Sequence, residues 1–291
     1  MNYIVEENND LVKYLTNKGL SKNKVKSLIK YKCIKVNNCL IEKLPYKLRI
    51  NDNISINLKK EPVLINIIYE DNNYLVVDKE NGLLSISTST HNKNIEDTLY
   101  RRVRNYLNSK KEFAFIVNRI DKETSGIVIF VKNEQLKKRL QDNWNKIVKA
   151  RKYIAVVSGK ITKNGRIDNY LYEDKKTFSH STTKGGKRAI TNYKVLNYNN
   201  NYTLLDINIE TGRKNQIRVH MTEMNHPIIG DKKYYSKTNP FKRLMLHHYE
   251  ISLINPLNNK EITFKSNIPN EFYKLFRTRT FFCSFIPFSN S

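Results

Sequence analysis

The sequence is dominated by short apolar stretches, rich in Val and Ile, that are separated by polar turns rich in Asn and Asp. Two such stretches flank a turn at 71–73, and two more flank a turn at 199–201, as expected for strands that are joined directly. Further strands are indicated by IVIFV at 127–131 and YIAVV at 153–157. Because direct turns join antiparallel strands and few helical patterns intervene, the sequence predicts an α+β domain.

Helical spacing of apolar residues occurs in three segments. The first covers residues 10–20 and ends at Gly19, the second begins after Ser21, and the third begins at Asn133. Their apolar positions are Leu11, Tyr14 and Leu15 in the first, Val25, Leu28 and Ile29 in the second, and Leu136, Leu140, Trp144 and Val148 in the third. We expect a further helix after the TGR sequence at 211–213.

The order of these elements divides the chain into a small and a large domain. Residues 1–58 combine the first two helices with three short strands, two of which flank a turn at Asn37 and Asn38. Residues 59–65 form a polar linker that contains a proline, and residues 66–280 form the larger domain. We expect the aromatic segment 281–291 to be a C-terminal tail, which either packs on the core or associates with another chain.

The chain carries 52 Lys and Arg residues against 27 Asp and Glu, a formal net charge of +25, which indicates a polyanionic partner. A hydrophobic share of 39% excludes a disordered polycation. Residues 1–60 alone hold 13 basic and 5 acidic residues, a net charge of 13 − 5 = +8. We expect phosphate contacts from the basic residues in and after the second helix, namely Lys22, Lys24, Lys26, Lys30, Lys32 and Lys35. The alternative is a solvated face of a Lys-rich chain.

Several classes of function are not indicated. The N-terminus lacks a secretion signal and no apolar run reaches the roughly 18 residues of a membrane helix, so we expect a cytoplasmic protein without a membrane partner. The three cysteines form no CxxC pair, and the histidines at 220, 226, 247 and 248 lack the spacing of metal ligands. Neither GxGxxG nor GxxxxGK occurs. We therefore expect neither a metal nor a cofactor.

The segment VNRIDKETSGIVIFVKN at 117–133 places a carboxylate in a loop between two apolar strands. Loops on rigid strands are common positions for catalytic groups. Arg119 and Lys122 bracket Asp121, and such cations favour the ionised form that a nucleophile needs. The alternative is a surface carboxylate in a turn, with Thr124 and Ser125 bonded to the backbone.

This loop, NRIDKETSG, resembles the HRLDxxTSG signature of the RluA-type pseudouridine synthases. Further stretches match that family in order: YEDNNYLVVDKENGLL, RKYIAVVSG, TGRKNQIRVHMTEMNHPIIGDKKY and LMLHHYEISLINP, so the resemblance covers residues 66 to about 268. It implies a catalytic domain on a mixed, mainly antiparallel sheet that isomerises uridine to pseudouridine in structured RNA without metal or cofactor. Large-subunit ribosomal RNA is the expected target, and transfer RNA is the alternative.

The resemblance also implies roles for individual residues. Asp121 matches the catalytic aspartate, which attacks either the ribose C1′ or the uracil C6. Tyr153 matches the tyrosine that packs on the target uracil and is implicated in moving its C5 proton, and Arg218 matches the arginine that pairs with the aspartate. The expected substrate-binding residues are Arg119, which can fill the gap left by a flipped nucleotide, Leu246, an apolar wall of the pocket, and Arg213.

Residues 1–58 resemble the alpha-L RNA-binding module, which would make the basic second helix a separate RNA contact. Four positions depart from the family pattern: Asn118 and Asn215 replace histidines, Glu80 replaces a proline, and His248 replaces a small residue. The Asn replacements support the alternative of an RNA-binding assembly factor with weak activity. An Asp-dependent glycosidase ranks last, because it needs a second carboxylic acid and only Glu123 is near in sequence.

Overall fold

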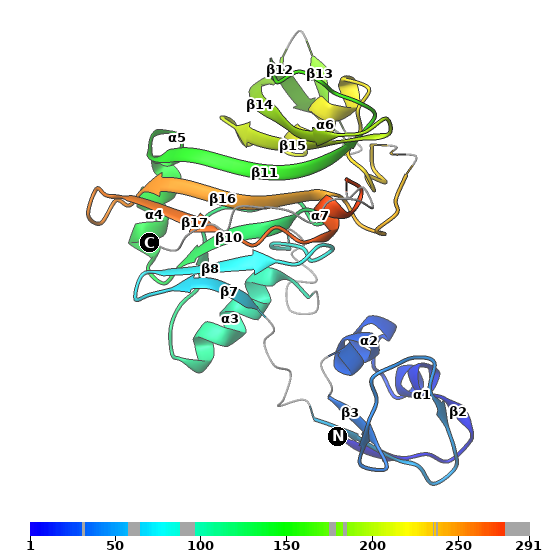
Figure 1. The fold of residues 1–291 in the computed structure, drawn as a ribbon. Helices are drawn as coiled ribbons and strands as arrows, with labels where there is room; N and C mark the ends of the chain where they lie inside the picture. Colours follow the sequence, from blue (N-terminus) through cyan, green and yellow to red (C-terminus); the bar gives the residue numbers. More distant parts are fainter. Residues whose placement is uncertain are drawn as a thin grey trace, which may run out of the picture. The chain divides into compact units, whose positions relative to one another are not determined.

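The computed structural model describes residues 1–30, 33–57, 65–87, 97–174, 179–182, 185–234, 236 and 238–276. The chain divides into two compact units, Met1–Leu64 and Ile65–Ser291 (Figure 1). Most of the predicted linker and the whole predicted tail, 281–291, lie outside the described residues, as does Lys32.

The smaller unit contains two helices, α1 (Leu11–Asn17) and α2 (Lys22–Lys30), and this prediction is confirmed. Asp10 caps α1 by accepting the backbone N–H of Val12 at 2.9 Å, and Ser21 accepts that of Lys24 at 3.2 Å. Four strands form one sheet in the order β1 (Asn2–Ile4), β6 (Asn53–Ile56), β3 (Ile34–Val36) and β4 (Cys39–Leu40), while β2 (Asn9–Asp10) pairs with β5 (Lys47–Leu48). The apolar residues predicted for the two helices are buried in the core of this unit.

The described strands of the larger unit form one sheet of eleven strands. Nine follow the order β13 (Ser179–Thr182), β12 (Gly165–Glu173), β14 (Lys187–Tyr198), β15 (Tyr202–Ile209), β11 (Val148–Ser158), β16 (Leu246–Ile254), β10 (Ser125–Val131), β8 (Tyr74–Lys79) and β7 (Asn66–Glu70). In addition, β17 (Glu261–Lys265) pairs with β16, and β9 (Phe115–Ile116) pairs with β10. Every described pair is antiparallel except β10 with β16, so the predicted mixed, mainly antiparallel sheet is confirmed.

Five described helices accompany this sheet: α3 (Leu99–Ser109), α4 (Glu134–Asp142), α5 (Trp144–Ile147), α6 (Gln216–Glu223) and α7 (Glu271–Lys274). The predicted single helix from Asn133 to Val148 is instead two helices, α4 and α5, which are interrupted at Asn143, and Val148 is not helical. Asn143 ends α4 and donates its side-chain amide to the carbonyl of Arg139 at 3.1 Å, and the short helix α5 follows as a separate element. Val148 instead begins β11 and pairs with Leu253.

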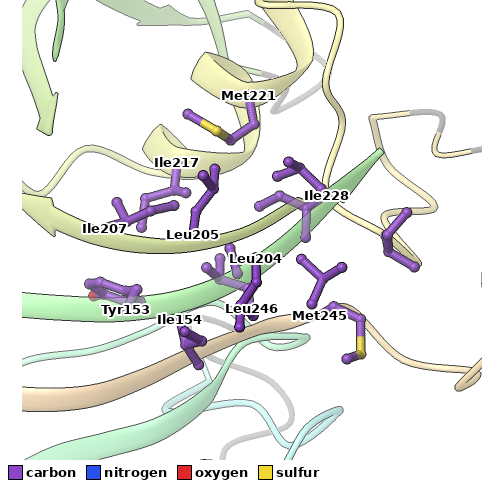
Figure 2. Close-up of a cluster of buried hydrophobic side chains, with 14 of the residues drawn as sticks. Tyr153, Ile154, Leu204, Leu205, Ile207, Ile217, Met221, Ile228, Met245 and Leu246 are labelled. Atoms are coloured by element: carbon purple, nitrogen blue, oxygen red, sulfur yellow. The ribbon is translucent and has the colours of Figure 1, made fainter. Parts of the chain in front are cut away.

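A core of buried apolar side chains joins α6 to the strands β11, β15 and β16. Figure 2 shows Ile217 and Met221 of α6 facing Leu205 and Ile207 of β15. Burying one side chain of this size contributes about 1.5 to 3 kcal/mol, so the cluster fixes α6 firmly on the sheet. This matters for the candidate site because Arg218 lies on α6.

The parallel pair β10 and β16 explains where the site forms. Parallel strands begin at the same edge of a sheet, so the segments that lead into them, 118–124 and 239–245, lie close together. Gly126 of β10 makes this approach possible, since a Cβ at that position would lie 2.2 Å from the carbonyl oxygen of His248. Within the described ranges, no helix is long and apolar enough to cross a membrane.

Candidate active site

A cavity of about 730 Å³ opens where these two segments meet. Its described lining combines acidic and many basic side chains, among them Asp121, Arg218, Asp231, Lys233, Arg119, Arg213, Lys122, Lys214, Lys242 and Arg243. The predicted residues Asp121, Arg218, Arg119 and Arg213 are therefore brought together in one cavity. Such a surplus of cations suits a ligand with several phosphates.

The loop that carries Asp121 is held by its backbone. Lys79 is fully buried at the end of β8 and donates from Nζ to the carbonyls of Glu80, Leu83 and Lys122 at 3.0, 2.7 and 2.9 Å. The hydroxyl of Ser85 donates to the carbonyl of Ile120 at 2.7 Å. These bonds fix the backbone on both sides of Asp121. Burial lowers the pKa of Lys79 to about 7.

The carboxyl group of Asp121 faces the cavity, with 29% of its side chain exposed. Nη1 of Arg218 lies 3.7 Å from its Oδ2. The prediction that Arg119 and Lys122 hold this group ionised is wrong in its physical cause. Burial raises the pKa of Asp121, and the cations that most oppose this shift are Arg218, Lys233 and Lys79. These three cations are distant from Asp121 in the sequence, so the residues next to Asp121 do not indicate them.

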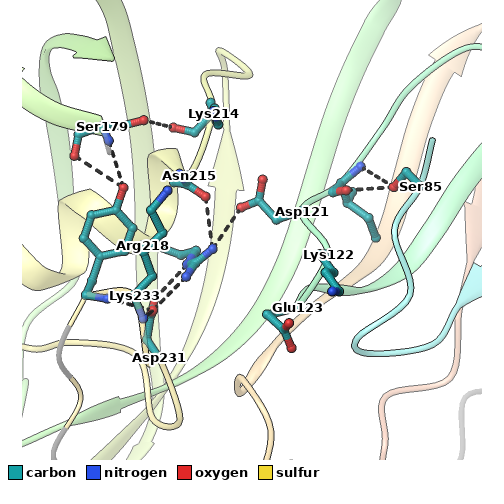
Figure 3. Close-up of polar contacts among 12 residues, drawn as sticks. Ser85, Asp121, Lys122, Glu123, Ser179, Lys214, Asn215, Arg218, Asp231 and Lys233 are labelled. Carbon is teal, nitrogen blue, oxygen red and sulfur yellow. Dashed lines mark hydrogen bonds and ion pairs between the residues drawn. The ribbon is translucent and has the colours of Figure 1, made fainter. Parts of the chain in front are cut away.

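Arg218 makes its strongest contacts with Asp231, which is not among the predicted site residues. Nε and Nη2 donate to the two carboxylate oxygens at 2.7 Å each, and the Asp231 side chain is fully buried (Figure 3). The ring of Tyr234 lies 5.2 Å from the guanidinium carbon. Although burial acts in the opposite direction, the hydrogen bonds and charge of Asp231 raise the pKa of Arg218. Arg218 is thus a fixed cation.

A smaller cavity of about 90 Å³ adjoins Asp121 and is lined by Tyr153 and Leu246. Tyr153 is stacked on His248, with ring centres 4.4 Å apart and planes 17° apart. Burial raises the pKa of Tyr153, so its hydroxyl stays protonated at neutral pH. A flat ring and an apolar wall beside a carboxylate suit a planar, polar ligand such as a base.

A chain of hydrogen bonds connects Arg243 to Asp78 through Ser125, His247 and Ser266. Arg243, which lines the larger cavity, donates to the Ser125 hydroxyl at 2.5 Å, and this hydroxyl contacts Nδ1 of His247 at 2.8 Å. Nε2 of His247 contacts Ser266 at 3.2 Å, and Ser266 donates to Asp78 at 2.9 Å. Because Ser266 donates its only proton to Asp78, it accepts from Nε2, so the neutral ring carries its proton on Nε2 and Nδ1 accepts from Ser125. Burial lowers the pKa of His247 to about 3, which keeps it neutral.

The four departures from the family pattern all have partners. The side-chain oxygen of Asn118 accepts the backbone N–H of Ile129 at 2.8 Å, and Glu80 forms an ion pair with Arg102 at 2.8 Å. His248 donates from Nδ1 to the carbonyl of Ile127 at 2.9 Å. Asn215 accepts from Arg218 at 3.0 Å. Each replacement therefore makes at least one hydrogen bond or ion pair, and none displaces Asp121.

The remaining predicted residues lie in the smaller unit. Lys22 and Lys26 on α2 and Lys35 on β3 are exposed, and Lys24 is half-buried. Lys30 ends α2, and Lys32 lies outside the described residues. No group of three His, Cys, Asp or Glu side chains that could bind a metal occurs in the described part of the chain.

Comparison with known proteins identifies the family. The model of the RNA pseudouridylate synthase family matches residues 73–223, just over half of the chain, and this range contains Asp121, Tyr153 and Arg218. A protein of Rickettsia felis named ribosomal large subunit pseudouridine synthase C is 34% identical over 234 residues, which cover 78% of this chain and 75% of that protein. A protein of Buchnera aphidicola named ribosomal large subunit pseudouridine synthase D is 30% identical over 279 residues, which cover 88% of this chain and 87% of that protein.

Solved structures show the same fold. Human RNA pseudouridylate synthase domain containing 1 superposes with a TM-score of 0.58 at 18% identity and covers 72% of this chain and 86% of its own. Human RNA pseudouridylate synthase domain containing 4 superposes with a TM-score of 0.56 at 20% identity and covers 71% of this chain and 90% of its own. The family model and the named relatives confirm the RluA-type resemblance. This chain belongs to the RNA pseudouridylate synthase family, as an RluA-type enzyme that forms pseudouridine in RNA.

Proposed function

We propose that this enzyme converts specific uridines of large-subunit ribosomal RNA to pseudouridine, and that Asp121 is its nucleophile. The observation that carries the proposal is the position of the Asp121 carboxyl group, which borders both the basic cavity and the smaller cavity under Tyr153. A nucleotide whose phosphates occupy the basic cavity can then place its base beside Asp121. Arg218, whose Nη1 lies 3.7 Å from Oδ2 of Asp121, stabilises the ionised carboxylate.

Access to the target requires that the base leaves its stack. A uridine within an RNA stem cannot reach a carboxylate inside a cavity, so the enzyme extrudes it, at a cost of a few kcal/mol for unstacking. Tyr153 and Leu246 supply the flat and apolar surfaces that repay this cost. Arg119 borders both cavities, a position from which its side chain can fill the gap in the RNA.

The reaction is an isomerisation in which no atom is gained or lost. Asp121 attacks either the ribose C1′ or the uracil C6, and the bond between C1′ and N1 breaks. The uracil turns within the cavity, and a new bond joins C1′ to C5. The bond to Asp121 breaks, either as C1′ joins C5 or when the C6 adduct collapses. The C5 proton passes to water and N1 takes up a proton from water, so the composition of the nucleotide is unchanged. Tyr153 is protonated at neutral pH, so its proposed role is to stack on the base and to position the water that accepts the C5 proton.

The choice of ribosomal RNA rests on the named relatives, two of which are ribosomal large subunit pseudouridine synthases. The exposed Lys22, Lys26 and Lys35 of the smaller unit supply additional phosphate contacts in this proposal. Residues 1–58 then act as a separate RNA-binding module of the alpha-L type. Deleting them is expected to weaken RNA affinity and its dependence on salt.

The test is tritium release from RNA transcribed with 5-tritiated uridine, because each turnover delivers the C5 hydrogen to water. Transcripts of large-subunit ribosomal RNA are expected to release tritium, and transfer RNA transcripts are not. Release from transfer RNA alone would replace the proposed target. Tight binding without release from either RNA would contradict an enzymatic role and favour an assembly factor.

A further inference from the structure

We propose that Asn215 is a positioning residue: it holds the guanidinium of Arg218 so that Nη1 faces the carboxylate of Asp121. The proposal rests on the role of Asp121 as nucleophile and adds a residue that the reaction needs without touching the RNA. Its basis is the hydrogen bonding of Arg218, drawn in Figure 3.

All three nitrogens of Arg218 have defined neighbours. Nε and Nη2 are occupied by Asp231, while Nη1 donates to Oδ1 of Asn215 at 3.0 Å and lies 3.7 Å from Oδ2 of Asp121. A guanidinium is planar and its N–H groups point in fixed directions. Once one hydrogen of Nη1 is directed to Asn215, the other is directed away from it. Figure 3 shows the contacts to Asn215 and to Asp121 leaving this nitrogen in different directions.

Asn215 occupies this position in spite of several unfavourable features. Its backbone is left-handed, with φ 55°, which is costly for a residue with a Cβ. It stands at the start of α6, where an Asn side chain usually caps the helix, yet it makes no capping bond. The backbone N–H of Arg213 is bonded instead by the side chain of Gln216, at 3.0 Å. The side chain of Asn215 is therefore not used to begin the helix.

The amide nitrogen of Asn215 is buried in an unfavourable position. Asn215 is 6% exposed, and its Nδ2 has no hydrogen-bond partner of normal geometry in the described part of the protein. The hydroxyl of Tyr234, which lies near Nδ2, already accepts the backbone N–H of Ser179 at 3.0 Å. A buried donor without a good partner destabilises the folded state. The hydrogen bond that Oδ1 accepts from Arg218 accounts for the presence of Asn215 at this buried position.

A neutral acceptor at this position keeps the pKa of Asp121 from rising further. Asp121 already faces Arg218 on α6, Lys233 and Asp231 in the segment after Gly230, and Lys79 at the end of β8. A second carboxylate on Nη1 would compete with Asp121 for the same cation and would raise the pKa of Asp121 by like-charge repulsion. Asn215 orients Arg218 without adding that charge.

The experiment compares Asn215→Gly and Asn215→Asp with the same changes at Asn259. Asn259 has the same φ of 55° and is exposed, so its variants control for left-handed backbone and for added charge. Glycine relieves the strain at φ 55°, which keeps the loss of folding small. We expect kcat of Asn215→Gly to fall about ten-fold with KM changed less than about two-fold, the effect of one hydrogen bond. The Asn259 variants should match the wild type.

Asn215→Asp keeps the acceptor, so its kcat at high pH should stay close to that of the wild type, while the acid limb of its pH profile moves to higher pH. An unchanged kcat in Asn215→Gly, or an unmoved acid limb in Asn215→Asp, would overturn the proposal. Carbon-13 NMR titration of the Asp121 carboxyl in the free enzyme, assigned with Asp121→Asn, gives a readout that does not need turnover. Both Asn215 variants should raise the pKa of the Asp121 carboxyl. An unchanged pKa would refute the positioning role of Asn215, even if the wild type released no tritium.

Discussion

Nη1 of Arg218 lies 3.7 Å from Oδ2 of Asp121, while the other two nitrogens of the same guanidinium are bound to Asp231. The stronger ion pair therefore holds the cation in place, and the weaker contact is left for the proposed nucleophile. A direct two-point pair with Asp121 would occupy both of its oxygens and would hinder attack. Division of one arginine between two carboxylates avoids that conflict.

The first prediction concerns Asp231→Asn. Removing the charge leaves Arg218 buried without its main counter-ion, which should cost about 3 kcal/mol of unfolding free energy and most of the activity. Urea unfolding followed by the fluorescence of the single tryptophan, Trp144, reports on the larger unit. The matched control is Asp168→Asn, which breaks a two-point pair with Arg188 at the surface and should change stability far less. Equal effects of the two changes would contradict this role for Asp231.

The second prediction concerns the acid limb of activity. Burial raises the pKa of Asp121 above its ordinary value of about 3.9. Because a nucleophile must be ionised, activity should be lost as the pH falls through this raised value, at a pH higher than an exposed aspartate would give. Single-turnover tritium release between pH 4 and pH 8, with stability checked at each pH, measures the limb. An acid limb at or below the ordinary value would contradict the burial argument.

Several features of the site could be predicted from sequence because they depend on neighbours in the chain. The helices α1 and α2 have local caps at Asp10 and Ser21. The Asp121 loop is confined by the apolar strand that follows it, and its placement in a cavity with Tyr153 and Arg218 was anticipated through ordered motifs. The caps need no information about the rest of the fold, whereas the grouping of Asp121 with Tyr153 and Arg218 was expected only from the family resemblance.

Other features could not be predicted because they depend on contacts between distant segments. Asp231 follows a glycine in a loop, and only the packing of α6 shows that it binds Arg218. The continuous fourfold spacing from Leu136 to Val148 concealed the end of α4 at Asn143, because Val148 is needed to pair with β16. The helix α3 was missed, although Leu99, Val103 and Leu107 are at helical spacing and buried.

The third prediction uses Lys79→Met. The folded-state pKa of Lys79 is about 7, below its unfolded value of about 10.5, so between these values the unfolded chain binds the proton and the folded chain does not. Stability from this group therefore rises as the pH rises from 7 to 10. The unfolding free energy of the wild type should increase over this range relative to the variant. Parallel pH curves for the two proteins would show that Lys79 keeps an ordinary pKa.

The fourth prediction concerns Gly126→Ala. The added Cβ would lie 2.2 Å from the His248 carbonyl oxygen at a φ of 115°, so β10 and β16 must separate. We expect a loss of about 3 kcal/mol or more in Trp144 unfolding experiments. Gly82→Ala is the control, since its φ is 80° and nothing lies within 4 Å of the new atom. It should cost only the backbone strain of about 1 to 2 kcal/mol. A smaller loss for Gly126→Ala than for Gly82→Ala would contradict the close approach.

The fifth prediction tests the central claim, that Asp121 performs the chemistry. Asp121→Asn keeps the size of the side chain and should stay folded, because burial disfavours the charge that it removes. Glu123→Gln, two residues away in the same cavity, is the matched control. The measurement is tritium release from 5-tritiated large-subunit ribosomal RNA by the wild type and both variants. We predict release by the wild type and Glu123→Gln and none by Asp121→Asn, whereas release by Asp121→Asn at the wild-type rate would contradict the claim.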